Sequence, residues 1–131
     1  MQATAADRHA KAAEGDYDVI IIGAGVSGLY QLHRLRELGL NVRVFDSASD
    51  VGGTWYWNRY PGARFDSESW SYGFSFSEEL LQEWNWREHF SAQPDTLAYL
   101  NYAADKFDFR RDITFNALVT AAHYDDDARL W

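Results

Sequence analysis

Three glycines with the spacing Gly-x-Gly-x-x-Gly are the residues whose chemistry is easiest to read in this sequence. Gly23, Gly25 and Gly28 directly follow the apolar run YDVIII at residues 17–22 and precede a helical pattern. In such a loop the first glycine permits a tight turn and the second lets the backbone approach a pyrophosphate. The third lets the helix pack on the strand. The pattern therefore predicts an anion site at the start of the helix, where backbone N–H groups and the helix dipole favour phosphate.

An acidic residue follows at the matching distance. Asp46 lies 18 residues beyond Gly28 and ends a second apolar run, NVRVF at residues 41–45. A carboxylate at this place can accept hydrogen bonds from both ribose hydroxyls of an adenosine, and it would repel a 2′-phosphate. The loop should therefore hold FAD or NAD, not NADPH. The alternative is a glycine-rich turn followed by a solvated aspartate, which explains fewer of these features.

The segment after Asp46 favours FAD over NAD. Gly52 and Gly53 allow the backbone to lie close to a planar ring system or its phosphates. They are followed by TWYW, whose aromatic rings can form a wall and whose Thr54 can donate a hydroxyl. The sequence then continues as NRYPGARFD, which places two cations and one carboxylate on a kinked loop.

The elements expected to position these residues are those of an α/β fold with a parallel sheet. Strands over 17–22 and 41–45 flank a helix over 27–38 that ends at Gly39, which makes a β-α-β unit. The first strand is apolar almost throughout, which predicts burial on both faces. Residues 47–76 show no clean period and are expected to form a functional loop.

Further helices and strands are expected toward the C-terminus. One helix should run over 77–86 with Ser77 as N-cap and with Trp84 and Trp86 in packing roles. Another should begin near Pro94, with an apolar stripe at 3-4-3 spacing. Strands are expected over 113–115 and 118–124, with a turn at 125–127.

Composition limits the partners of the chain. Of its 131 residues, 47% are hydrophobic and 24% charged, and the net charge is −8. An acidic chain without a Lys/Arg cluster is a poor partner for nucleic acid and for anionic lipid. The absence of cysteine excludes disulfides, iron–sulfur clusters and a cysteine nucleophile, and the four histidines lack metal spacing. No apolar run is long enough for a membrane span.

These features predict a cytoplasmic protein with two parts. Residues 1–15 lack the apolar stretch of a signal peptide and are expected to be a flexible polar leader. Residues 16–131 are expected to form the N-terminal part of a Rossmann-like domain, because only two or three parallel strands are visible where such a sheet has five or six. The remainder of its own polypeptide would then complete the fold.

Four runs carry a family resemblance: GAGVSGLYQLHRLRELG, DVGGTWYWNRYPGARFDSES, SEELLQEWNW and QPDTLAYLNYAADKFD. Over residues 17–131 the chain resembles the N-terminal region of Type I Baeyer–Villiger monooxygenases of the phenylacetone and steroid monooxygenase kind. The resemblance implies the FAD-binding portion of a flavoenzyme with two dinucleotide-binding domains. There NADPH reduces FAD, O2 adds to the reduced flavin, and the resulting C4a-peroxide converts a small-molecule ketone into an ester or lactone.

The resemblance also implies roles for individual residues. Asp46 matches the ribose-binding acid, although the family more often has Glu there. Asp66 matches a supporting catalytic residue that holds an arginine expected beyond Trp131; its alternative is a loop aspartate bonded to its own backbone. The implied cofactor-binding residues, for FAD or for the nicotinamide end of NADPH, are Gly23, Gly25, Ser27, Gly28, Asp46, Gly53, Thr54, Trp55, Trp57, Arg64, Phe65, Asp66, Tyr72 and Val119.

Two other functions stay open at this point. An N- or S-oxidising flavin monooxygenase would share the glycine loop and the GGxW element, but generally lacks the NRYPGAR…D continuation. A non-catalytic FAD-binding fragment is the third reading. The sequence does not identify the ketone.

Overall fold

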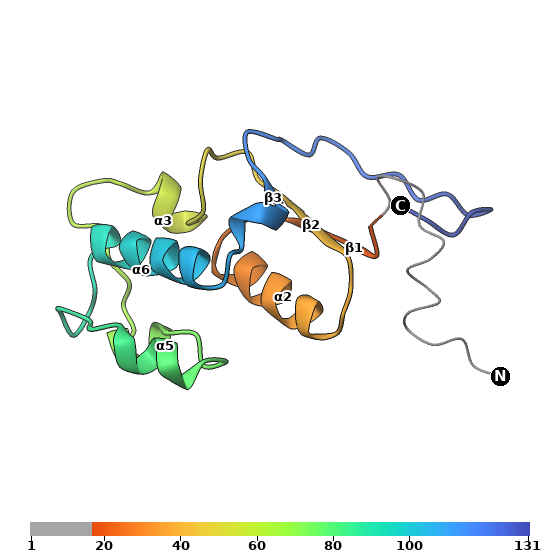
Figure 1. Cartoon of the computed structure of the whole chain (residues 1–131). Coiled ribbons are helices and arrows are strands. Elements are labelled where there is room, and N and C mark those ends of the chain that lie inside the picture. Colours follow the sequence, from red (N-terminus) through yellow and green to blue (C-terminus); the bar gives the residue numbers. More distant parts are fainter. Residues whose placement is uncertain (1–16) are drawn as a thin grey trace.

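The computed structural model describes residues 17–131, so the leader expected over 1–15 lies outside the described residues. The strands are β1 (Val19–Ile22), β2 (Val42–Phe45) and β3 (Ile113–Thr114). The helices are α2 (Val26–Glu37), α3 (Thr54–Trp57), α4 (Ser69–Tyr72), α5 (Glu78–Glu83) and α6 (Gln93–Lys106), with the short 3-10 helix η1 at Arg110–Asp112. Figure 1 shows the helices gathered beside one small sheet.

The sheet is parallel and has the order β1-β2-β3. Val19 pairs with Val42, and Val44 pairs with Ile113. The connection from β1 to β2 runs through α2, so the predicted β-α-β unit is confirmed. The described residues form an incomplete, Rossmann-like α/β arrangement.

Helix α2 packs its apolar side on the sheet. Leu29 and Leu32 are fully buried, and they belong to one core with Ile21 and Val44. The helix ends as the sequence predicts, because Gly39 has φ +74°, which a residue with a side chain rarely adopts. Burial of these four side chains fixes the helix on β1 and β2.

The prediction that β1 is buried on both faces was wrong. Ile20 is 53% exposed and Ile22 is 66% exposed, whereas Ile21 between them is 5% exposed. Alternate residues of a strand point to opposite faces. The helices of the described chain cover only the face to which Ile21 points, so the other face of β1 stays apolar and open.

Helix α5 is shorter than predicted. Its N-cap is confirmed, since the Ser77 hydroxyl accepts a hydrogen bond from the Leu80 N–H at 3.1 Å. The helix ends at Glu83, however, because Trp84 adopts extended backbone angles. Trp84 and Trp86 then place their rings 5.4 and 4.9 Å from the ring of Tyr99, which confirms packing roles outside the helix.

Helix α6 forms the support under the irregular middle of the chain. It carries Pro94 in its first turn, as predicted, and buries Leu100 and Ala104. Tyr99 is also buried, and its hydroxyl accepts a hydrogen bond from the Phe74 N–H at 2.6 Å. Burial raises the pKa of Tyr99 to about 12, so the phenol stays neutral. Figure 1 shows α3 lying along the first turns of α6.

The strand predicted over 118–124 is not formed. This segment is irregular, and Leu118 is 73% exposed. A strand needs a neighbouring ladder for its backbone N–H and C=O groups, and no other described segment lies along it. The turn at 125–127 is confirmed and closes with an antiparallel bridge between Asp125 and Leu130. Within residues 17–131 no helix is long and apolar enough to cross a membrane.

Candidate functional site

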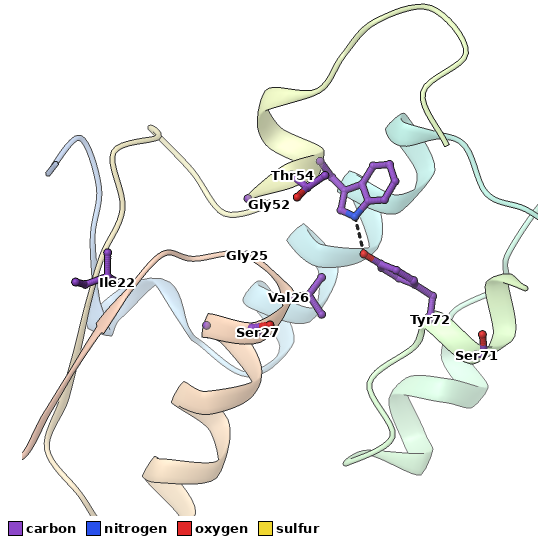
Figure 2. A pocket seen from close by; sticks show the side chains of 11 residues that line it. Ile22, Gly25, Val26, Ser27, Gly52, Thr54, Ser71 and Tyr72 are labelled. Carbon is purple, nitrogen blue, oxygen red and sulfur yellow. Dashed lines mark hydrogen bonds between the residues drawn. The ribbon is translucent and has the colours of Figure 1, made fainter. Parts of the chain in front are cut away.

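A cavity of about 660 Å³ lies where α2, α3 and α4 approach one another. It falls in the size range of pockets for small molecules and cofactors. Figure 2 shows the glycine loop on one side of it and the Trp55 and Tyr72 side chains on the other. Its lining residues are Ile22, Gly25, Val26, Ser27, Gly28, Gly52, Gly53, Thr54, Trp55, Ser71 and Tyr72.

The glycine loop is built as tightly as its spacing predicts. Gly23 has φ +103°, which makes the turn out of β1. A Cβ on Gly28 would lie 1.9 Å from the Gly23 carbonyl oxygen, so only glycine fits where α2 meets the loop. The two positions therefore require glycine for different reasons: Gly23 adopts a positive φ angle, and Gly28 leaves room for the Gly23 carbonyl.

Gly25 meets the second glycine pair. A Cβ on Gly25 would lie 3.3 Å from the Gly53 Cα, and a Cβ on Gly53 would lie 2.7 Å from the Gly25 Cα. Beside this contact the Gly52 N–H donates to the Ala24 carbonyl oxygen at 3.1 Å. The two glycine segments, distant in the sequence, thus form a single backbone platform at the cavity.

The start of α2 is open toward the cavity. Its N-cap residue is Gly25; no side chain caps this end, and the first turn contains no acidic residue. The first N–H groups of a helix have no partner within the helix, and they carry the positive end of its dipole. Ser27 and Gly28 from this turn line the cavity. An anion bound here would meet unpaired donors.

Asp46 lies at the end of β2 and is 7% exposed. Its carboxylate accepts hydrogen bonds from the Ala24 N–H at 2.5 Å and from the Ala48 N–H at 2.7 Å. Each oxygen has a further lone pair, so the carboxylate keeps capacity for another donor. Asp46 therefore ties the glycine loop to β2 in addition to any contact with a ligand.

An aromatic wall faces the glycine platform. The Trp55 indole N–H donates to the Tyr72 hydroxyl oxygen at 2.7 Å, the bond drawn in Figure 2. Behind it, the rings of Phe65 and Tyr72 stack with centroids 4.4 Å apart. The Gln93 amide fixes the backbone of this wall by donating to the Trp55 carbonyl oxygen at 2.5 Å. The wall is held at three points, which suits a site that accepts a flat ring.

The cavity brings together about half of the residues predicted from the sequence. Those that line it are Gly25, Ser27, Gly28, Gly53, Thr54, Trp55 and Tyr72. Gly23 and Asp46 lie behind the lining and shape the loop. Phe65 lies behind Tyr72.

Four further predicted residues do not line the cavity either: Trp57, Arg64, Asp66 and Val119. Trp57 is 59% exposed and packs on Tyr56. Arg64 turns to Glu88 and to the Phe90 carbonyl, at 3.0 and 2.9 Å. Asp66 is exposed.

Four lining residues are absent from the predicted list: Ile22, Val26, Gly52 and Ser71. Of these, Gly52 was expected only as a glycine that lets the backbone lie close to a ligand. Ile22 directly precedes the glycine motif and Val26 lies within it, so both could have been found from their places in the sequence. Ser71 carries no such signal, because only the folding of the irregular segment brings α4 to the cavity. Within the described residues no group of three or more His, Asp or Glu side chains is placed to hold a metal ion.

Fold and site together define a Rossmann-like dinucleotide-binding unit: a glycine loop between β1 and α2, and an acid at the end of β2. A family profile described as an NAD(P)-binding Rossmann-like domain matches residues 21–83, which span this unit.

The chain is similar to three characterised monooxygenases. It is 54% identical over 114 residues to acetone monooxygenase (methyl acetate-forming) of Gordonia sp. strain TY-5. It is 52% identical over 122 residues to a Baeyer–Villiger monooxygenase of Pseudooceanicola batsensis. It is 47% identical over 116 residues to phenazine N-monooxygenase PhzNO1 of Lysobacter antibioticus. These matches cover 87%, 92% and 88% of this chain.

Solved structures show the same fold. Oxidised steroid monooxygenase bound to NADP matches with a TM-score of 0.83 and 59% identity over 85% of this chain. The OTEMO complex with FAD and NADP matches with a TM-score of 0.83 and 48% identity over 88% of this chain. The resemblance seen in the sequence is confirmed, and the chain is a relative of the Baeyer–Villiger monooxygenases. It spans about a fifth of the length of these relatives, 21% of the acetone monooxygenase and 22% of OTEMO.

Proposed function

We propose that this chain is the FAD-binding portion of an NADPH-dependent Baeyer–Villiger monooxygenase that acts on a small-molecule ketone with O2. The observation that carries the proposal is the shared cavity. The glycine loop, the Gly52–Gly53 step and the bridge between Trp55 and Tyr72 all face it. The structure of OTEMO with FAD and NADP and that of steroid monooxygenase with NADP support the same cofactors.

The residues of the cavity fit the parts of FAD. The pyrophosphate would bind at the uncapped start of α2. Gly25 and Gly53 have no side chains, so the backbone can lie close to it there. Asp46 would accept ribose hydroxyls with its remaining lone pairs. Thr54, Trp55 and Tyr72 would hold the ring portion on the opposite side. Val119 would contact the adenine side through its backbone, as the resemblance implies.

FAD, when bound, would supply hydride acceptance and oxygen activation. The chain's own residues would bind and orient it and exclude water from one side. Asp66 would hold an arginine from elsewhere in the polypeptide, and Arg64, Phe65 and Asp66 would lie near the nicotinamide end of NADPH. Because Asp66 is exposed in this chain, its carboxylate is available for such a partner. Trp57 would belong to the flavin-side wall, as the resemblance implies.

The proposal is tested on the full natural polypeptide that carries this chain. The purified protein should show a bound-flavin absorbance spectrum, oxidise NADPH in preference to NADH, and convert ketones to esters or lactones. The sequence of residues 1–131 contains one Gly-x-Gly-x-x-Gly loop, so this chain alone should not oxidise NADPH. Absence of flavin from protein refolded with excess FAD would contradict the proposal.

A second candidate, nitrogen oxidation, rests on one relative. The phenazine N-monooxygenase is 47% identical over 116 residues, so similarity over this region does not by itself separate ketone oxidation from nitrogen oxidation. Product analysis with a ketone and with an aromatic amine or N-heterocycle distinguishes the two.

A further inference from the structure

Arg110, the first residue of η1, joins α6 to the loop that carries Gly52 and Gly53 of the cavity lining, although Arg110 does not itself line the cavity. Its Nε donates to Asp50 Oδ1 at 2.9 Å, in the loop between β2 and α3. Its Nη2 donates to Asn101 Oδ1 at 2.5 Å, and its Nη1 donates to Asp105 Oδ1; both acceptors are on α6. All three guanidinium nitrogens are thus engaged, one toward the loop and two toward the helix.

The contact at Asp50 continues into the glycine platform. Asp50 Oδ1 also accepts the N–H of Val51, a fully buried residue, at 2.8 Å. The next residue, Gly52, donates its N–H to the Ala24 carbonyl and lies against α6, where a Cβ would be 2.6 Å from Leu97 Cδ1. A movement of Asp50 would therefore be passed to Gly52 through one buried residue.

We propose that Arg110 is a positioning residue for the FAD site, setting where the Gly52–Gly53 step lies over the glycine loop without touching the cofactor. This inference rests on the proposed function. The Arg110 side chain is 31% exposed and that of Asp50 is 44% exposed, so the charge attraction of this pair is weakened by solvent. The contribution of Arg110 lies in the planar fork, which reaches three acceptors in fixed directions; a lysine ammonium does not reproduce this geometry.

The experiment uses the full polypeptide and measures the FAD dissociation constant by titration of flavin fluorescence. Arg110→Gln is expected to weaken FAD binding by about ten-fold, the effect of one lost charged hydrogen bond. Arg110→Lys should fall between Gln and the wild type. In the FAD-free protein, hydrogen exchange at the Gly52 N–H should be faster in Arg110→Gln.

Two matched controls separate positioning from general stability. Arg111 is the neighbouring arginine; it pairs with Asp108 and Asp112 at 3.4 and 3.7 Å, outside the 46–53 loop, so Arg111→Gln should leave FAD binding unchanged. Asp105→Asn removes a charge from α6 but keeps the contact between Arg110 and Asp50, so it should be milder than Arg110→Gln.

The outcomes are distinguishable. Wild-type affinity in Arg110→Gln, or an equal loss in Asp105→Asn, would overturn the positioning role and leave the proposed function intact. In the double variant Arg110→Gln/Asp50→Asn, FAD affinity should fall no further than in the weaker-binding single variant, because both changes remove the same contact. Additive losses of FAD affinity would also overturn the inference. If the wild type binds no FAD, the proposed function fails and this inference fails with it.

Discussion

Helices α2 and α5 begin in opposite ways, although both present unpaired N–H groups and the positive end of a dipole at their first turn. At α5 the chain completes this end itself: the Ser77 hydroxyl accepts from the Leu80 N–H, and Glu78 and Glu79 follow. At α2 the N-cap is Gly25, no side chain caps it, and no acid follows.

The N–H groups in the first turn of a helix need hydrogen-bond acceptors, and the comparison shows that either the protein or a ligand can provide them. Ser77 satisfies a donor that would otherwise be unpaired, which stabilises the fold. The start of α2 instead lines the cavity with bare backbone. Changes at α2 should therefore alter FAD binding, and changes at α5 should alter stability alone.

The largest effect is expected for Gly28→Ala. The added Cβ would lie 1.9 Å from the Gly23 carbonyl oxygen, and backbone atoms on both sides cannot move aside cheaply. We expect no measurable FAD binding and a loss of about 3 kcal/mol or more in the free energy of unfolding. Flavin content after purification and urea unfolding measure the two effects. Gly73→Ala is the control, because its Cβ would clash only with the flexible end of Leu81 and would lie at an ordinary contact distance of 3.7 Å from the Tyr99 hydroxyl; an equal loss there would refute the explanation.

Asp46→Ala is expected to come next. It removes the acceptor of the Ala24 and Ala48 N–H groups and the proposed acceptor of the ribose hydroxyls. FAD affinity should fall by about ten- to a hundred-fold. Asp46→Glu keeps the charge and should be mild. A titration of Asp46→Ala that matches the wild type would show that this carboxylate has no part in binding.

Gly25→Ala should have a moderate effect. Gly25 has φ −84°, so alanine is not strained by its backbone. Its methyl group would instead press on Gly53 at 3.3 Å and stand between the backbone and the pyrophosphate. FAD binding should weaken by about ten-fold, with little change in the unfolding of the FAD-free protein. A variant that unfolds more easily but binds FAD equally tightly would place Gly25 in the fold and not in the site.

The smallest effect on FAD should come from Ser77→Ala. Loss of the cap should lower the free energy of unfolding by about 1 kcal/mol. FAD affinity should not change, because α5 does not line the cavity. Thermal unfolding and the flavin titration measure the two quantities on one sample. A weaker FAD affinity in Ser77→Ala would contradict the view that the start of α5 affects stability alone.

The sequence by itself determined the elements that depend on neighbouring residues. The β-α-β unit, the glycine loop, the Ser77 cap and the start of α6 near Pro94 follow from short-range hydrogen bonds and from apolar periodicity. Residues of the cavity that sit within the two glycine-rich segments could be predicted for the same reason. Gly25 and Gly28 are clear cases, because the Gly-x-Gly-x-x-Gly spacing by itself indicates a phosphate-binding loop.

Only the tertiary structure decided the features that join distant segments. The contact of Gly25 with Gly53, the fork of Arg110 on Asp50 and the early end of α5 depend on partners far away in the sequence. The segment 118–124 has the composition of a strand, yet it forms none without a neighbouring ladder among the described residues. Backbone pairing and close packing are satisfied only in three dimensions, so no local pattern can specify them.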